Sequence, residues 1–322
     1  MDAAAEPGSD LTFREGTAAD LTATFELSER AMHEAAARQG VVSRDPPLSD
    51  ARIRADWLRH RSLVEFIAAQ PDGRYVICES EDGMLGYARV ARFGAIEQLT
   101  ELMVHPAHQG HGVGRALLER CWPGDPSPEL GRVVVAAGAP NDLTLYTDFG
   151  VMPVGGHWHM RARAEDYLFH RSQETDAPVP AVHVLKPDRA VEEWIRLEPD
   201  AIGHDRRPLH EFFARDRTCL AYTAPGGEEP AALCWVSTDG DIGPAIGQAA
   251  GDLVPVVMAA LDRVAKSREP ETLGVYVTTL SWWLIRRLRR LGFQVFWPSW
   301  VMCSVPLPGL DRYVPTRPPH VL

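Results

Sequence analysis

The chain has 322 residues and a hydrophobic content of 45%, which is enough for buried cores and suits two domains of ordinary size. Its formal net charge of −11 argues against nucleic acid as a partner. The five cysteines lack metal-ligand spacing, and the first ten residues lack the apolar segment of a signal peptide. No apolar run approaches the ~20 residues that a membrane-spanning helix needs. These features predict a cytoplasmic protein that associates with neither membrane nor nucleic acid.

Beyond a predicted disordered tail at residues 1–10, the first half of the chain alternates helices and strands. We predict a strand at 11–14, helices at 17–38 and 48–70, strands at 74–79 and 84–93 joined by a turn at Asp82-Gly83, a strand at 99–104, a helix from 113, a strand at 131–137, a helix at 141–148 and a strand at 154–163. This order predicts a mixed α/β fold.

The centre of this half is a strand, a glycine-spaced loop and a helix. Pro106 ends the strand because proline has no N–H to donate. Gly110, Gly112 and Gly114 follow, and each is free of the restriction that a Cβ imposes on the backbone. A loop of this kind at a helix start aims unpaired N–H groups and the positive end of the helix dipole at one point. We therefore predict an anion site that suits phosphate.

The loop fits one phosphate motif better than the others. It departs from the dinucleotide fingerprint at Arg115, where a third glycine or an alanine is required, and it has no Lys-Ser/Thr pair of the P-loop. It does match Gln/Arg-x-x-Gly-x-Gly at Gln109, Gly112 and Gly114, between a strand and an amphipathic helix. In this it resembles the pyrophosphate loop of the GNAT superfamily of acyl-CoA-dependent N-acyltransferases.

A second match to this family lies around the helix predicted at 141–148. The family has an Asn before this helix and a Tyr four residues before the Gly of a Gly-Phe pair. Asn141, Tyr146 and Gly150 match, while Val151 replaces the usual Phe. The resemblance covers about residues 11–166 and implies a GNAT fold.

The second half repeats the order of the first after a polar, proline-bearing stretch at 171–180, which we predict to be a linker. Predicted strands lie at 181–185, 219–223, 231–237 and 273–277, and predicted helices at 189–197, 253–264 and 281–291. The resemblance then implies tandem GNAT folds packed as a pseudo-dimer: a catalytic domain at 11–170 and a degenerate GNAT-like domain at 181–322. The second copy has no basic residue at 247–252, and Leu288 stands where the first copy has Tyr146.

The resemblance also implies how acetyl-CoA is held. The loop N–H groups would hold the pyrophosphate, a bulge in the central strand would open a slot for the pantetheine arm, and the N–H of Val104 would face the thioester carbonyl. The implied cofactor-binding residues are Met103, Val104, His105, Gln109, Gly110, His111, Gly112, Val113, Gly114, Arg115, Asn141 and Tyr146. No metal is expected, since the nearby His105, His108 and His111 lie where the phosphates bind.

Three residues are candidates for the chemistry. Tyr146 would protonate the departing thiolate, because a phenol holds its proton at neutral pH; the alternative is a tyrosine that lines the core. Glu101 or Glu97 would take the proton of the amine, with Glu101 closer to the thioester; the alternative is a solvated carboxylate at the strand end. His157 and His159 either line the acceptor pocket or are polar residues of an edge strand.

The function implied is an N-acetyltransferase that moves the acetyl group of acetyl-CoA to a primary amine of a small molecule or peptide, by direct attack through a tetrahedral intermediate. Alternatives are an acyltransferase with a larger acyl-CoA or an aminoacyl-tRNA donor, and a CoA-binding module without catalysis. The partners expected are acetyl-CoA and an amine, in a monomer or homodimer.

Overall fold

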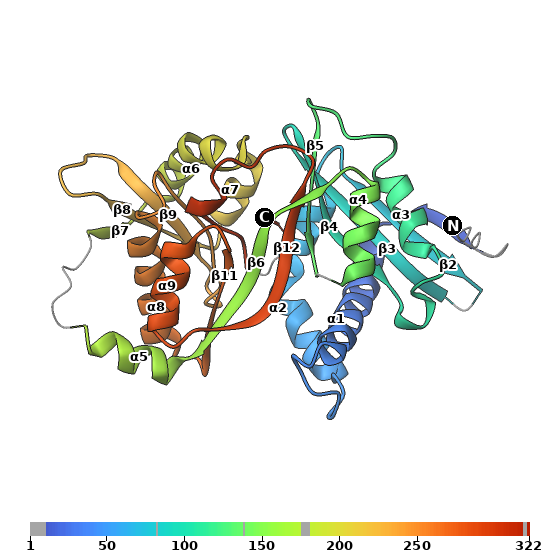
Figure 1. Ribbon diagram of the computed structural model, residues 1–322, viewed down its shortest axis with the longest axis horizontal. Coiled ribbons are helices and arrows are strands. Elements are labelled where there is room, and N and C mark those ends of the chain that lie inside the picture. The colour runs from blue at the N-terminus through green and yellow to red at the C-terminus, as the bar shows by residue number, and fades with distance from the viewer. Residues whose placement is uncertain (1–10, 82, 138, 175–180, 318–320) are drawn as a thin grey trace. The chain divides into compact units, whose positions relative to one another are not determined.

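The computed structural model describes residues 11–81, 83–137, 139–174, 181–317 and 321–322 (Figure 1). The predicted tail at 1–10, Asp82 of the predicted turn and residues 175–180 of the predicted linker lie outside the described residues. Contacts between Cα atoms divide the chain into two compact units. Unit 1 is residues 1–134 with 144–151, and unit 2 is residues 135–143 with 152–322.

Unit 1 is built on a mixed sheet with helices on both faces. The strands follow the order β1 (Thr12–Glu15), β2 (Arg74–Ser80), β3 (Gly83–Phe93), β4 (Ile96–Val104) and β5 (Gly131–Ala136), with β4 and β5 parallel and the other neighbours antiparallel. The helices are α1 (Leu21–Arg38), α2 (Asp50–Ala68), α3 (Val113–Cys121) and α4 (Pro140–Asp148), with 3-10 turns η1 (Ala18–Asp20) and η2 (Pro106–His108). β5 and α4 cross the boundary between the units.

Local sequence explains where these helices begin and which side they bury. Thr17 and Asp20 form a capping box ahead of α1, and the Ser49 hydroxyl accepts the Arg52 N–H at the start of α2. The apolar face of α1 packs on the sheet in a cluster with α2. The cluster comprises Leu21, Phe25, Leu27, Ile53, Val64, Tyr75, Ile77 and Tyr87. α1 and α2 therefore cover this face of the sheet.

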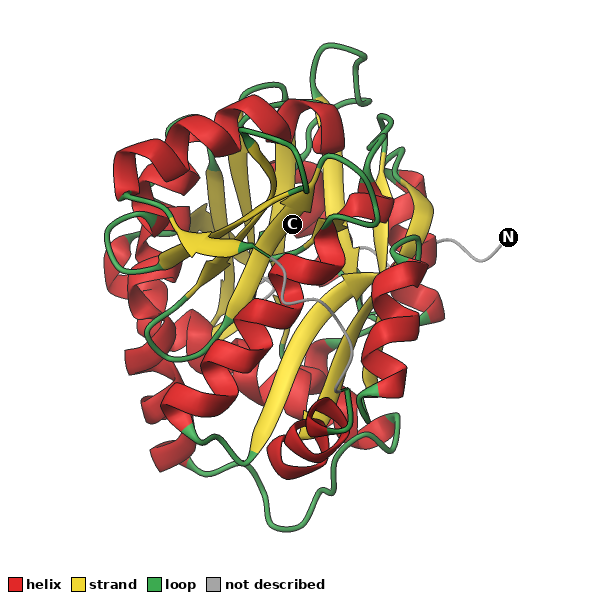
Figure 2. Ribbon diagram, turned by 90° about the vertical axis from the view of Figure 1, so that its left-hand side faces the viewer, coloured by secondary structure: helices red, strands yellow, loops and turns green. Residues whose placement is uncertain are grey.

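Unit 2 contains two groups of strands and most of the remaining helices (Figure 2). In one group β6 (Met152–Arg163) lies between β12 (Gln294–Cys303) and β11 (Thr272–Thr278); the other has the order β13 (Tyr313–Val314), β10 (Ile242–Gly247), β9 (Pro230–Val236), β8 (Thr218–Thr223) and β7 (Val182–Val184). Its helices are α5 (Ala164–Ser172), α6 (Pro187–Ile202), α7 (Arg207–Phe213), α8 (Leu253–Arg268) and α9 (Trp282–Arg290), with the 3-10 turn η3 (Leu310–Arg312).

β6 precedes the predicted linker in sequence but pairs with strands of the second half. It is antiparallel to β11 along one edge and to β12 along the other. Its Met160 and Ala162 belong to the same buried cluster as residues of α8, β11 and α9. The contacts therefore place the boundary between the two units at Val151 and Met152, ahead of the predicted linker. Arg171 and Ser172, which we predicted to be part of that linker, lie in α5. The domain ranges 11–170 and 181–322, and their packing as a pseudo-dimer, stay predictions.

Pairing on both edges of β6 corrects one interpretation of its histidines. His157 and His159 are 1% and 8% exposed, so they are not polar residues of an edge strand. Both rings stack on Tyr276, with centroids 4.8 and 4.4 Å apart. Burial lowers the pKa of His157 to about 3 and that of His159 to about 2, so both are neutral in the folded protein.

Candidate active site

β4 carries a bulge close to its junction with the glycine loop. Its register with β3 pairs Glu101 with Arg89 and then Leu99 with Val90, so Thr100 is the extra residue. The Thr100 hydroxyl donates to the Arg89 carbonyl at 3.1 Å, which holds the extra residue in place. The predicted bulge in the central strand is confirmed.

β4 separates from β5 at the same place. Along the described residues of the two strands, the parallel pairing ends at Leu99 and Val134. On the other edge, the His105 N–H donates to the Leu85 carbonyl at 2.7 Å. Main-chain groups of successive residues point to opposite edges of a strand, so the N–H of Val104 points to the edge that β5 has left. The main-chain N–H of Leu102 points to the same edge, while those of Met103 and His105 point to β3.

The loop after β4 has the backbone that its glycines predict. Gly110 and Gly112 have φ values of +81° and +82°, in the left-handed region that glycine enters without strain. Gly112 is the residue that caps the start of α3, and Val113 is buried behind it. The Gln109 amide folds back and donates to the Val104 carbonyl at 3.1 Å. The loop is thereby fixed to the end of β4, with Gly110 and His111 exposed.

Gly114 has a different role from the other two glycines. A Cβ at this position would lie 3.7 Å from side-chain atoms of both Leu145 and Val104. A side chain at this position would therefore face the junction of α3 with α4 and β4, where its Cβ would make ordinary van der Waals contacts. A Cβ at Gly110, in contrast, would meet no heavy atom within 4 Å.

α4 carries Tyr146 to the start of α3. Leu145 packs beside Gly114, and Asp148 forms an ion pair with Arg115. Tyr146 lies between these two contacts and is 7% exposed. Arg115, expected near the pyrophosphate, is thus already paired with a carboxylate. Asn141 is exposed in the first turn of α4, one residue inside the helix, and belongs to unit 2.

Glu101 lies on the sheet face that α1 and α2 cover. It is 5% exposed, so the alternative of a solvated strand-end carboxylate is wrong. The Tyr87 hydroxyl donates to its Oε1 at 2.9 Å, and Arg89 donates to its Oε2 in an ion pair. The Arg89 guanidinium in turn lies 4.5 Å from the centre of the Tyr75 ring. Both oxygens of Glu101 are therefore engaged within the protein.

Glu97 lies at the far end of β4 from the loop. It is 3% exposed and pairs with Arg74 at 2.9 Å, beside a cavity of about 100 Å³ that Arg132 also lines. Val104 lies seven residue steps further along the strand, a span of roughly 23 Å at ~3.3 Å per residue. This span disfavours Glu97 as the base for a thioester held at Val104, and its catalytic role stays a prediction.

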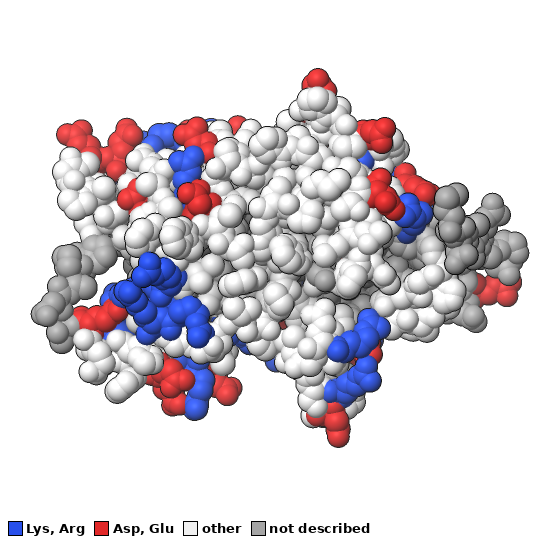
Figure 3. Space-filling view, in the orientation of Figure 1, with Lys and Arg blue, Asp and Glu red and all other residues white. Residues whose placement is uncertain are grey.

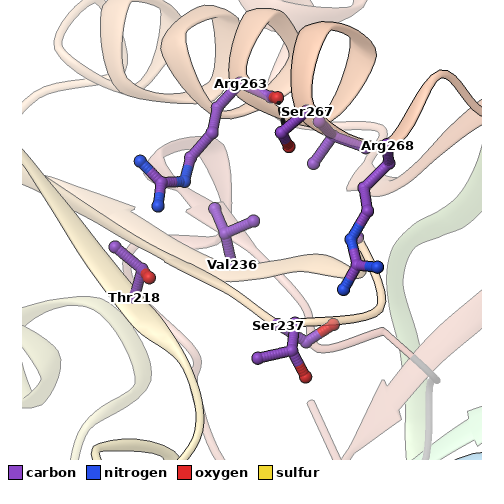
Figure 4. A pocket seen from close by; sticks show the side chains of 9 residues that line it. Thr218, Val236, Ser237, Arg263, Ser267 and Arg268 are labelled. Carbon is purple, nitrogen blue, oxygen red and sulfur yellow. Dashed lines mark hydrogen bonds between the residues drawn. The ribbon is translucent and has the colours of Figure 1, made fainter.

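Another cavity lies in unit 2 and contains none of the predicted site residues. It measures about 180 Å³ and lies under the last turns of α8, where the side chains of Arg263 and Arg268 point over Thr218 and Ser237 (Figure 4). Within the described part of the chain, no cluster of three or more His, Cys, Asp and Glu could hold a metal ion. The same residues include no helix that is long and apolar enough to cross a membrane.

Comparison with known protein sequences gives one family and two relatives. Residues 71–150 match the family model described as an acetyltransferase (GNAT) domain. Mycothiol acetyltransferases of Sanguibacter keddieii and Nocardiopsis dassonvillei are 32% identical over 103 residues and 27% identical over 167 residues. The matches span 32% and 50% of this chain, and 27% and 49% of the relatives, which is at most about half of their length.

Comparison with solved structures covers nearly the whole chain. A protein of Pyrococcus horikoshii described as a candidate acetyltransferase has a TM-score of 0.67 and 14% identity, over 97% of this chain and 96% of that one. A tandem GNAT protein from the clavulanic acid biosynthesis pathway has a TM-score of 0.58 and 17% identity, over 92% and 99%. At these identities the likeness establishes the fold. Residues 71–150 thus match a GNAT acetyltransferase domain, and the chain as a whole shares the fold of a tandem GNAT protein.

Proposed function

We propose that the protein is an N-acetyltransferase that moves the acetyl group of acetyl-CoA to a primary amine. The observation that carries this proposal is the open edge of β4 directly ahead of the glycine loop. A main-chain edge and a phosphate loop, adjacent in sequence, suit a ligand with an amide-bearing arm and a pyrophosphate. CoA has both.

The reaction follows from where these groups lie. The N–H groups around Gly110 and Gly112 hold the pyrophosphate, and the edge at Leu102 and Val104 pairs with the pantetheine arm. The amine attacks the thioester carbon, and the Val104 N–H donates to the oxygen that becomes negative in the tetrahedral intermediate. Loss of such a donor costs roughly 2.7–4 kcal/mol in other acyl-transfer enzymes. Tyr146 then protonates the departing thiolate.

Acetyl-CoA binds once per chain, in the first copy. At the corresponding place in the second copy, Asp252 stands just before α8 and its carboxylate accepts the Ala249 N–H at 3.1 Å. The chain's own carboxylate thus occupies a donor that a phosphate would need, and its charge repels one. Leu288, where the first copy has Tyr146, is fully buried and has no proton to give. These contacts support a structural role for the second copy.

Two alternative donors and a non-catalytic role remain distinct hypotheses. A larger acyl-CoA would use the same loop and edge. An aminoacyl-tRNA would need an extended basic surface, and on the face shown in Figure 3 the basic side chains form separate groups with acidic ones among them. A CoA-binding module would bind CoA without turnover.

The test is a screen for CoA release. Purified protein with acetyl-CoA is offered primary amines in turn, and free thiol is measured against a reaction without amine. We expect thiol release that depends on one class of amine, with the acetylated amine detected by mass spectrometry. CoA binding without release for any amine or acyl chain would overturn the catalytic proposal and favour the binding module.

A further inference from the structure

We propose that Glu29 of α1, and not Glu101, binds the ammonium group of the acceptor and takes its proton. This inference rests on the proposed function and names the acceptor class, a cationic amine that carries an apolar group. Glu29 lies outside every motif used above. Its position, its contacts and its neighbours carry the argument.

The turn of α1 that contains Glu29 lies at the reacting end of β4. The side chain of Ser28, the residue before Glu29, is buried and close enough to the Tyr87 hydroxyl to lower its pKa against the larger effect of burial. Tyr87 lies directly opposite Met103 in the register of β3 with β4, one residue from Val104. α1 packs over both strands on this face (Figure 1). Along the direction of β4, Glu29 therefore lies at the same position as the Val104 N–H, which we assign to the thioester oxygen.

The carboxylates of Glu101 and Glu29 differ in what they contact. Glu101 is 5% exposed, and both of its oxygens accept hydrogen bonds from protein groups. Glu29 is half-buried, and among the described residues no hydrogen-bond donor reaches its carboxylate. A base must present a lone pair to the proton it removes. Glu29 has lone pairs available to a ligand, whereas those of Glu101 that face Arg89 and Tyr87 are occupied.

The charges around Glu29 favour a cation. Asp56 of α2 lies near it but pairs with Arg52 at 2.6 Å, and Glu101 of β4 pairs with Arg89. The charges within each of these two ion pairs cancel, so the carboxylate of Glu29 contributes one net negative charge. Burial and then repulsion from Asp56 raise the pKa of Glu29 to about 7, with a smaller opposing attraction by Arg52 and a still smaller repulsion from Glu101. A base with this pKa is ionised at pH 8 and exchanges protons readily near neutrality.

Aromatic rings of α1 and α2 gather one helical turn before Glu29, around the buried ring of Phe25. Phe25 lies one helical turn before it, and the rings of Trp57 and His60 lie 5.3 and 6.2 Å from the Phe25 ring. His33 lies one turn after Glu29, and among the described residues its shielded Nε2 has no hydrogen-bond partner. An amine whose substituent is an alkyl or aryl group would contact the partly buried rings of Trp57 and His60 while its ammonium reaches Glu29.

The proton balance closes without a further reactant. The Glu29 carboxylate takes one proton from the ammonium, and the lone pair freed on nitrogen forms the C–N bond to the thioester carbon. When the C–S bond breaks, the CoA thiolate takes a proton from Tyr146, which recovers one as the amide nitrogen loses its second proton. Glu29 returns its own proton to water. One proton is thus released per acetyl transfer.

The test uses 2-phenylethylamine as the probe and its uncharged analogue 2-phenylethanol, both with the full chain. Calorimetry at pH 8 compares the wild type with Glu29→Gln and with Glu26→Gln, an exposed glutamate on the same helix. We expect Glu29→Gln to weaken amine binding about 10- to 100-fold, with Glu26→Gln and alcohol binding unchanged, since a hydrogen bond to a charged group is lost. Amine binding to the wild type should also weaken as the pH falls below about 7.

Two results would overturn the inference: equal amine affinity in the wild type and Glu29→Gln, or a wild type that binds the amine no more tightly than the alcohol. Failure of the proposed function looks different. In that case amine binding still depends on Glu29 while no amine releases CoA. If amines are acetylated and Glu29→Gln retains the kcat/KM of the wild type across pH 6–9, the function stands and the assignment of Glu29 fails.

Discussion

Two substitutions at Gly110 that differ only in charge test whether the loop binds pyrophosphate. Gly110 has a φ of +81°, and a Cβ there would meet no heavy atom within 4 Å. Asn and Asp are the residues that tolerate this backbone best after glycine, and they have nearly the same shape. Gly110→Asn and Gly110→Asp therefore share the same backbone cost, and their difference reports one negative charge.

The expected difference follows from Coulomb's law. A unit charge about 6 Å from another costs roughly 0.7 kcal/mol in water and roughly 2.8 kcal/mol at the effective dielectric of a protein surface. The pyrophosphate carries two charges, and the loop is exposed, so the value lies nearer the aqueous limit. We expect Gly110→Asp to bind acetyl-CoA more weakly than Gly110→Asn by about 1.5–3 kcal/mol, which is roughly 10- to 100-fold.

Calorimetric titration of acetyl-CoA into both variants at 50 and 300 mM salt measures this difference, and the gap should narrow at the higher salt. Circular dichroism confirms that both variants are folded. Equal affinities for the two variants at low salt would refute the placement of the pyrophosphate at this loop.

Four further predictions concern chemistry, stoichiometry and stability. Tyr146→Phe should leave acetyl-CoA affinity unchanged and lower kcat by about 100-fold, as steady-state kinetics would show, because the ring remains and only the proton donor is lost. Calorimetry should give one acetyl-CoA site per chain, and two equal sites would contradict the degenerate second copy. Glu101→Gln should destabilise the protein by about 3–5 kcal/mol in urea unfolding, because Arg89 then stays buried without its counter-charge. Stability should fall as the pH drops below about 6.5, where the unfolded chain protonates its histidines while buried His157 and His159, with pKa values of about 3 and 2, stay neutral. At pH 5 each should account for about 2 kcal/mol of the loss, and a His157→Asn variant should show a shallower pH dependence in urea titrations.

The sequence determined the parts of the site that depend on neighbouring residues. Gly110 and Gly112 adopt the left-handed backbone that only glycine enters freely, and Val113 begins a helix whose apolar side is buried. Such features are set within a few residues, by the backbone freedom of glycine and the 3.6-residue period of the helix. For the same reason the helix bearing Tyr146 was predicted to within one residue.

The tertiary structure decided everything that depends on which strands and helices meet. Nothing near Glu101 in the sequence indicates that Arg89 and Tyr87, from a different strand, occupy its oxygens. The proximity of Ser28 to Tyr87, which sets the position of Glu29 along β4, joins residues far apart in the chain. β6 pairs with strands more than a hundred residues later, because its buried side chains complete a core that the second half builds. A carboxylate's role is set by its partners, and folding chooses those partners from the whole chain.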